Sequence, residues 1–142
     1  MKIDKNWLVG FVDGEGCFYI GINKSVDLNT GYQILPEFRI VQHERDIKLL
    51  YAIKSFFGHG MVVPNRSKDS SIYEYRIRKF DVLHDVIVPF FESNKLLTCK
   101  KFNFLAFRDV ILMMKQQEHL TESGLNKIIA IKGRMNRSLP IK

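Results

Sequence analysis

Arginine, glutamine and asparagine recur at alternate positions in two stretches of the chain, and their side chains can hydrogen-bond to the edges of nucleic-acid bases. Arginine pairs with guanine, whereas glutamine and asparagine pair with adenine. A single polar residue of this kind on a strand needs no functional explanation, because one face of an antiparallel sheet is commonly exposed to solvent. The whole set is more informative, because three arginines share one predicted face with the amides. The members of this polar set are Tyr19, Asn23, Ser25, Gln33, Glu37, Arg39, Asn65, Arg76 and Arg78.

Alternating hydropathy predicts the hairpin that carries the first part of this set. Apolar and polar residues alternate from Phe18 to Ser25 and from Gln33 to Ile40, on either side of a turn at residues 27–31. The apolar side of each strand would face a core, and the polar side would face outward into solvent. Pro36 fits poorly inside a central strand, so we expect an edge position or a bulge there.

Helical periodicity predicts the other elements, and together they define an α+β fold. Two antiparallel hairpins alternate with helices in the order αββαββα, with one more helix at the end. The four strands would form one antiparallel sheet with the helices on one face and the polar set on the other. Asp4 would cap the first helix and Asp81 the third, whose end Pro89 would disturb. The expected helices cover residues 4–15, 44–57, 81–91, 98–117 and 121–135, and the second hairpin has strands at 61–65 and 73–78.

Length, charge and cysteine content narrow the class of protein. The 142 residues suffice for a single domain, residues 1–142, and an aromatic content of 12% argues against a disordered basic tail. A formal charge of +7 favours an anionic partner such as nucleic acid, the plain alternative being a soluble protein that happens to be basic. The sequence has no apolar run of about 18 residues, so no membrane span is predicted. The start does not resemble a signal peptide. Cys17 and Cys99 lack the spacing of a zinc site or a disulfide framework, which fits a reducing interior.

The first predicted helix contains two glycines four residues apart, Gly10 and Gly14. Each costs up to about 1 kcal/mol relative to alanine inside a helix. A sequence that accepts both costs is expected to need the close approach of another backbone on that face of the helix. Gly16 would then end the helix.

The string from Leu8 to Gly16, LVGFVDGEG, resembles the LAGLIDADG motif, and its flanks (Trp7 before it, CFYI after it) match as well. With the order of elements, the charge and the length, the chain is similar to the single-motif, intron-encoded branch of the LAGLIDADG homing endonucleases. The likeness extends to about residue 115. It implies the homing-endonuclease fold with a saddle-shaped sheet. It also implies site-specific, metal-dependent cleavage of both DNA strands at a long pseudo-palindromic site, leaving short 3′ overhangs.

The resemblance also implies where the chemistry lies. The motif acid is Glu15, in place of the commoner aspartate, and its carboxylate would ligate Mg²⁺ together with a backbone carbonyl near Gly14. Mn²⁺ or Ca²⁺ could occupy the same site, the latter without catalysis. Asp13, the other motif acid, is expected to support the helix end or its packing rather than to bind metal.

Three further residues are assigned to catalysis by the same resemblance. Gln42, at the end of the second predicted strand, would orient the attacking water. Lys100 and Arg45 would offset the charge that builds on the phosphate. Lys101 is an alternative to Lys100, because Cys99 separates Thr98 from the lysine pair that often follows it directly in the family.

One motif acid per chain is too few for a nuclease site, so the resemblance implies a homodimer. Two motif helices would pack through Trp7, Gly10, Phe11 and Gly14 and bring both Glu15 carboxylates to a shared interface. Each sheet would then read one half of a double-stranded DNA target of roughly two helical turns.

The polar set, joined by Arg66 from the turn of the second hairpin, would supply the DNA contacts. No membrane partner is expected. The implied location is intracellular, in a chloroplast, a mitochondrion or a bacterium, with the gene inside an intron.

Two other functions fit the same fold. An intron RNA maturase could use the same basic saddle, and a DNA-binding protein could have lost cleavage. The change from aspartate to Glu15 slightly favours the second alternative, because one extra methylene can shift a bound metal. A purely structural basic domain would not explain two glycines beside an acid.

Overall fold

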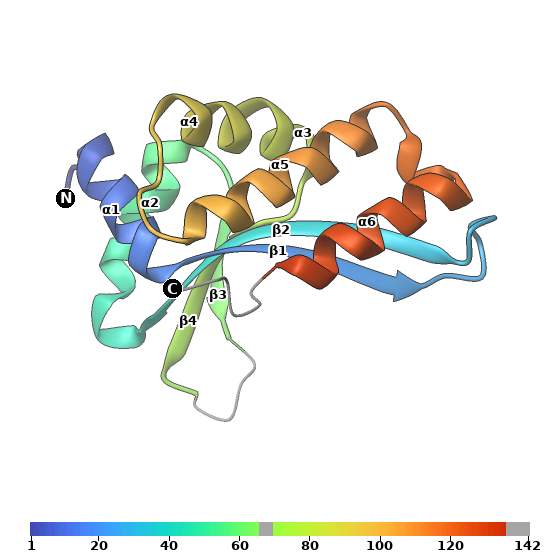
Figure 1. Cartoon of the computed structure of the whole chain (residues 1–142). Coiled ribbons are helices and arrows are strands. Elements are labelled where there is room, and N and C mark those ends of the chain that lie inside the picture. The colour runs from blue at the N-terminus through green and yellow to red at the C-terminus, as the bar shows by residue number, and fades with distance from the viewer. Residues whose placement is uncertain (66–69, 136–142) are drawn as a thin grey trace.

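The computed structural model describes residues 1–65 and 70–135, and the elements follow the predicted order (Figure 1). Four antiparallel strands form one sheet in the order β1-β2-β4-β3. The strands are β1 (Gly16–Lys24), β2 (Tyr32–His43), β3 (Met61–Pro64) and β4 (Ile72–Ile77). The helices are α1 (Lys5–Glu15), α2 (Ile47–Phe57), α3 (Phe80–Val82), α4 (Val88–Ser93), α5 (Lys100–Lys115) and α6 (Glu122–Arg134). Short turns of 3-10 helix, Glu44–Asp46 and Glu118–Leu120, precede α2 and α6.

Alternation along the strands builds the core on one side of the sheet. Phe18, Phe38 and Tyr75, from three different strands, are fully buried against the helices. The Phe18 ring makes edge contacts with Phe91 and Phe104, at centroid distances of 5.5 and 5.4 Å. Each such ring contributes roughly 1.5–3 kcal/mol by its burial. The predicted α+β architecture and the assignment of the apolar strand faces to the core are therefore confirmed.

Pro36 lies on a stretch of β2 that has a partner on one side only. The register of β1 and β2 runs without a bulge, from Gly16 opposite Ile40 to Lys24 opposite Tyr32. On its other side β2 pairs with β4 only from Phe38 onward. The expected edge position is confirmed, since Pro36 gives up a backbone N–H where β4 does not reach.

The third predicted helix differs from expectation at both ends. It starts after Lys79, so Asp81 lies in its first turn and does not cap it. It also continues past Pro89 to Ser93, through a π-helical segment (Leu83–Ile87) that joins α3 to α4. In this wider turn the Val88 N–H donates to the carbonyl of Leu83, five residues back. The π turn accommodates Pro89, which has no N–H to donate, so the helix does not break there.

Candidate active site and nucleic-acid interface

Glu15 lies at the point where α1 ends and β1 begins with no loop between them. Asp4 fixes the start of the helix, because its carboxylate accepts hydrogen bonds from the N–H groups of Asn6 (3.0 Å) and Trp7 (3.1 Å). At the other end, a Cβ added to Gly16 would come within 2.6 Å of Val12 Cγ1. Only glycine allows this tight passage from helix to strand, which leaves the Glu15 side chain exposed at the end of the sheet.

Gln42 reaches Glu15 from the end of β2. Its side-chain amide N–H donates to Oε1 of Glu15 at 3.0 Å. The pairing of Gly16 with Ile40 explains this contact, because Gln42 then lies just beyond the first residue of β1. The structure thus brings a carboxylate and an amide together at the end of the motif helix.

Lys100 is the third side chain at this point. Its ammonium group donates to the carbonyl oxygen of Gly16, directly after Glu15. The ammonium group of Lys101 instead lies over the ring of Phe102, 5.3 Å from the centroid. Of the two candidate lysines, Lys100 is therefore the one that reaches the motif.

Arg45 is not part of this hydrogen-bonded group. It lies in the turn after β2, where its backbone N–H donates to Nδ1 of His43 at 3.1 Å. Within residues 1–65 and 70–135, no hydrogen bond or ion pair joins its guanidinium to Glu15, Gln42 or Lys100.

Asp13 ties α1 to the start of α5. Its carboxylate accepts hydrogen bonds from the N–H of Leu97 (2.9 Å) and from the N–H and hydroxyl of Thr98 (3.0 and 2.8 Å). Thr98 Oγ1 in turn accepts the N–H of Lys100 at 3.2 Å. Partial burial acts to raise the pKa of Asp13, but these hydrogen bonds and the charge of Lys100 outweigh it and lower the pKa below the usual value. The same contacts place the Lys100 backbone beside the motif.

The oxygen atoms around Glu15 fit a hard divalent cation that keeps several of its waters. Among the described residues, Oε2 of Glu15 accepts no hydrogen bond, so one carboxylate oxygen is available. Carboxylate and carbonyl oxygens, such as those at the end of α1, are the ligands that Mg²⁺ and Ca²⁺ prefer. No group of three His, Cys, Asp or Glu side chains gathers to hold a metal anywhere in the described part of the chain. A metal here would therefore need ligands from water, from DNA or from a second protein segment.

The face of α1 that carries the two glycines is open. Trp7 is 46% exposed and stacks on Phe11 with a centroid distance of 4.9 Å. A Cβ added to Gly10 or Gly14 would meet nothing within 4 Å. Contacts within the described residues therefore do not account for the two glycines, whereas close approach of a partner helix would.

The polar sheet face differs from the expected wet surface at Glu37, which is only 5% exposed. Its Oε2 accepts a hydrogen bond from Arg39 Nη1 at 3.1 Å, and its Oε1 accepts one from Arg78 Nε. The prediction that Glu37 points into solvent is wrong, because long arginine side chains lie over the acid.

Glu74 repeats this arrangement on β4. It is 6% exposed, accepts a hydrogen bond from Asn65 Nδ2 at 2.8 Å, and lies 3.6 Å from Nη1 of Arg76. The outward face of the sheet therefore carries two buried acids, each paired with cationic neighbours. The net positive charge of this face comes from arginines that the acids hold in place.

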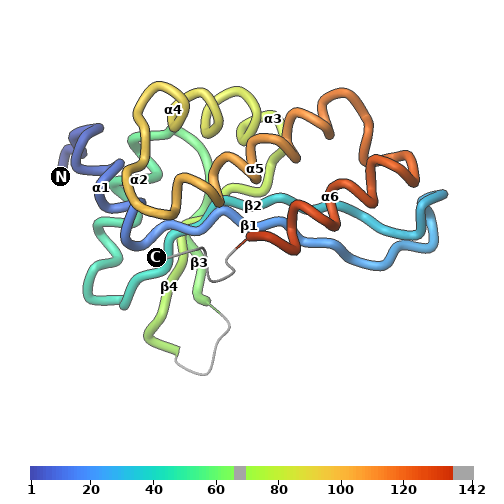
Figure 2. Tube along the Cα trace, in the orientation of Figure 1, coloured from blue at the N-terminus to red at the C-terminus, as the bar shows by residue number. Residues whose placement is uncertain are grey.

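Two cations lie over the ring of Tyr19, and one of them was not predicted. The guanidinium carbon of Arg39 is 5.1 Å from its ring centroid, and Nζ of Lys132 is 4.8 Å from it. Lys132 comes from α6, which runs beside β1 (Figure 2). Strand alternation could not reveal this residue, since it belongs to a helix more than one hundred positions along the chain.

Several members of the polar set line a hollow of about 540 Å³ over β1 and β2. Asn23 and Gln33 are exposed and lie opposite each other on β1 and β2. They are close to the hairpin turn, where the Ser25 N–H donates to the carbonyl of Gly31. Arg66 lies outside the described residues. The residues that line the hollow are Tyr19, Gly21, Asn23, Leu35, Pro36, Glu37, Arg39 and Arg78.

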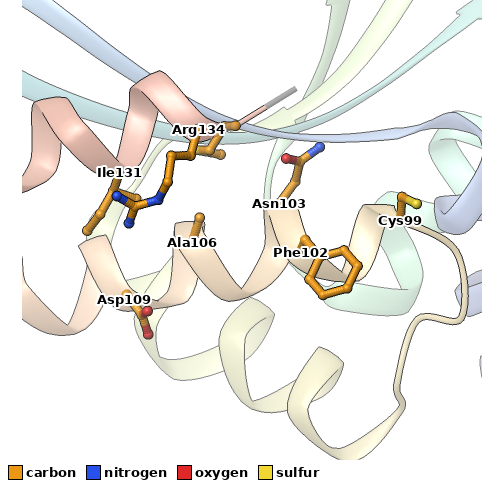
Figure 3. A pocket seen from close by; sticks show the side chains of 8 residues that line it. Cys99, Phe102, Asn103, Ala106, Asp109, Ile131 and Arg134 are labelled. Atoms are coloured by element: carbon orange, nitrogen blue, oxygen red, sulfur yellow. The ribbon is translucent and has the colours of Figure 1, made fainter. Parts of the chain in front are cut away.

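A second hollow, of about 490 Å³, lies between α5 and α6 (Figure 3). Phe102 and Ala106 of α5 and Ile131 of α6 make it largely apolar, and Asp109 and Arg134 contribute opposite charges. None of the predicted site residues lines it.

Comparison with known proteins gives matches over most of the chain. A family model described as LAGLIDADG endonuclease matches residues 8–111. The probable intron-encoded endonuclease 2 of Neurospora crassa is 34% identical over 127 residues, which are 89% of this chain and 26% of that protein. DNA endonuclease I-CeuI of Chlamydomonas moewusii is 26% identical over 94% of this chain and 62% of its own. The chain thus spans about a quarter of the first relative's length.

Solved structures match as well. The homing endonuclease I-TnaI superposes with a TM-score of 0.90 and 50% identity, covering 98% of this chain and 92% of its own. I-SmaMI bound to cleaved DNA has a TM-score of 0.89 and 34% identity, covering 94% of this chain and 44% of its own. I-SmaMI is also known bound to an uncleaved DNA target in the presence of calcium ions.

Proposed function

The chain belongs to the LAGLIDADG endonuclease family, and on that premise we propose that it is a homing endonuclease that cuts both strands of DNA at a specific site with a divalent metal. The observation that carries this proposal is the contact of Gln42 with Glu15 at the end of the motif helix, 3.0 Å between Nε2 and Oε1. Proteins named as DNA endonucleases are among its relatives, and I-SmaMI is known bound to cleaved DNA.

Each side chain at the end of α1 has a distinct task in this reaction. Glu15 would hold Mg²⁺, or Mn²⁺ in its place, and the metal when bound would activate water and stabilise the leaving 3′-oxygen. The Gln42 amide group is oriented by its N–H bond to Glu15, so its carbonyl oxygen can accept a hydrogen bond from the attacking water. The Lys100 ammonium lies beside the Gly16 carbonyl and would offset negative charge on the phosphate. Arg45 would contribute at longer range, from the turn after β2.

The open face of α1 supports a homodimer. Exposed Trp7 and half-buried Phe11 flank Gly10 and Gly14, and both glycines leave room for a second helix backbone. Two copies would bring two Glu15 carboxylates to one interface, which supplies the ligands that a single chain lacks. The relative known with calcium ions and DNA supports a hard divalent cation as the metal.

The polar sheet face would bind double-stranded DNA, with one half-site per copy. A dimer of this size would contact roughly two helical turns of a pseudo-palindromic target. The finer features, short 3′ overhangs and an intron as the location of the gene, rest on the family resemblance and on relatives named as intron-encoded. Within the part of the chain that the structure describes, no helix is long and apolar enough to cross a bilayer.

Cleavage of the intron insertion site tests the proposal. The protein is incubated with duplex DNA that carries the junction where the intron inserts, with Mg²⁺ or with EDTA. We expect double-strand cuts in the presence of Mg²⁺ and none in EDTA. We also expect Glu15→Gln to abolish cutting while DNA binding persists, because the amide cannot replace a charged metal ligand. Binding without cutting by the wild type would identify the non-cleaving alternative. Stimulation of intron RNA splicing, with no DNA cleavage, would identify a maturase.

A further inference from the structure

We propose that Glu37 is a specificity-determining positioning residue, which holds Arg39 and Arg78 in the geometry that reads guanine and does not itself contact DNA. The inference rests on the proposed function, because it concerns how the DNA target is read.

The Glu37 carboxylate occupies an unusual place for an acid. A negative charge on a surface that meets phosphates weakens DNA binding, so an acid there needs another reason to be present. Glu37 is 5% exposed, and both of its oxygens are occupied by guanidinium groups. With two cations and one anion, this cluster keeps a net positive charge while its acid is shielded from DNA.

Glu37 orients the two guanidinium groups and still leaves donors available on them. Arg78 bonds to Glu37 through Nε, so both of its terminal nitrogens remain for other acceptors, and its side chain is 60% exposed. Arg39 bonds through Nη1, and the ring of Tyr19, 5.1 Å away, restrains it further. Guanine O6 and N7 accept from two donors of one guanidinium, which requires that the fork be correctly oriented. A side chain already held in place loses less conformational freedom when it binds.

The donors of the two arginines lie over the same hollow of the sheet face. Arg39 and Arg78 both line the hollow of about 540 Å³ on the sheet face, together with Tyr19 and Asn23. Arg39 extends from β2, whereas Arg78 directly follows β4, the neighbouring strand. Adjacent strands lie about 4.8 Å apart, which is more than the rise of about 3.4 Å from one base pair to the next, so we expect the two arginines to read two guanine positions in each half-site.

Selection from a randomised duplex library tests the inference even though the target sequence is not known. The full chain and its Arg39→Ala, Arg78→Ala and Glu37→Gln variants each select DNA from the same pool at the same salt concentration. We expect each arginine variant to lose one guanine preference. Glu37→Gln should lose both, with discrimination falling roughly tenfold or more at each position. Its binding to unselected DNA should be unchanged or tighter, because a negative charge is gone.

Glu92→Gln is the matched control. It removes the same charge from α4, where Glu92 forms an ion pair with Arg108 at 3.5 Å. The selected sequence should not change in this variant. If Glu37→Gln unfolds, Glu37→Asp replaces it, since the shorter side chain withdraws the carboxylate from both arginines.

Two results would overturn the inference. One is a Glu37 variant that keeps both guanine preferences that the arginine variants lose. The other is loss of a base preference that neither arginine variant loses, which would make Glu37 a direct contact. If the wild type enriches no sequence at all, the proposed function itself fails, and the two failures are therefore distinguishable.

Discussion

At the scale of single residues, the end of α1 gathers three groups of different charge from distant parts of the chain. A carboxylate, an amide and an ammonium group meet there because α1 passes directly into β1, β2 returns beside it, and α5 begins at the same place. The Lys100 contact spans 84 positions of sequence. The site is therefore a property of the fold, and each group depends on a different element for its position.

The two neighbouring lysines make a matched pair for a test of this arrangement. We expect Lys100→Ala to lower the rate of DNA cleavage by roughly 10²–10³, the usual loss when one group that stabilises developing charge is removed. Lys101→Ala should change the rate little, because its ammonium lies over Phe102 instead. Single-turnover cleavage with saturating protein separates this effect from binding. Equal losses in both variants would mean that the lysines act only through their charge.

At the scale of elements, periodicity was sufficient for the sheet but not for contacts between elements. Alternation placed Phe18 and Tyr75 in the core correctly, because each strand has one buried face. It placed Glu37 in solvent wrongly, because the acid is buried by Arg39 of its own strand and by Arg78, which follows β4, and the pattern of one strand does not show this. The motif string predicted that Glu15 would lie at the end of the first helix, where the structure places it, whereas Lys132 had no local signal.

The link between α1 and α5 predicts a pH-dependent stability. Asp13→Ala removes the acceptor for Leu97 and Thr98, and we expect it to lower the free energy of unfolding by about 1 kcal/mol at neutral pH, as for the loss of a helix cap. The folded-state pKa of Asp13 is lowered, so its stabilisation is complete above the unfolded-state pKa of about 3.9 and is lost as pH falls through the folded-state value.

Urea unfolding at pH 7 and at pH 3 measures this difference. The gap between wild type and Asp13→Ala should shrink at the lower pH, while Asp27→Ala, in the exposed hairpin turn, should show little gap at either pH. A gap that stays constant with pH would show that the charge of Asp13 contributes nothing.

The position of α6 beside β1 predicts that the last helix takes part in DNA binding. Lys132 lies over Tyr19 on the polar face, so we expect Lys132→Ala to weaken binding about equally for all sequences and to reduce the salt slope by about 1. Lys127→Ala is the control, because Lys127 is an exposed lysine of the same helix. Equilibrium binding over a series of salt concentrations gives both slopes. An equal reduction in the two variants would point to overall charge rather than to the position of Lys132.

At the scale of the whole molecule, the described residues of one chain carry one predicted metal-binding acid, Glu15, together with a polar sheet face and an open face of α1. The helices cover one side of the sheet (Figure 1), while a Cβ added to Gly10 or Gly14 of α1 would meet nothing within 4 Å among the described residues. Glycine in a helix lowers its stability, so these residues are a cost to a monomer. A second copy packed on this face would account for that cost and would complete the proposed metal site at the same time.

Gly10→Leu tests this assembly without disturbing the single chain. A Cβ at position 10 meets nothing within 4 Å in one copy, and replacing glycine inside a helix should stabilise the monomer by up to about 1 kcal/mol. In a dimer the same side chain would hold the two helices apart, so we expect a monomeric mass in sedimentation at micromolar concentration, together with loss of double-strand cleavage. Gly133→Leu is the matched control, since Gly133 in α6 is equally open and should leave the dimer intact. A dimer that survives Gly10→Leu would show that the interface lies on another face, and Glu15 would then have to find its metal-binding partner elsewhere.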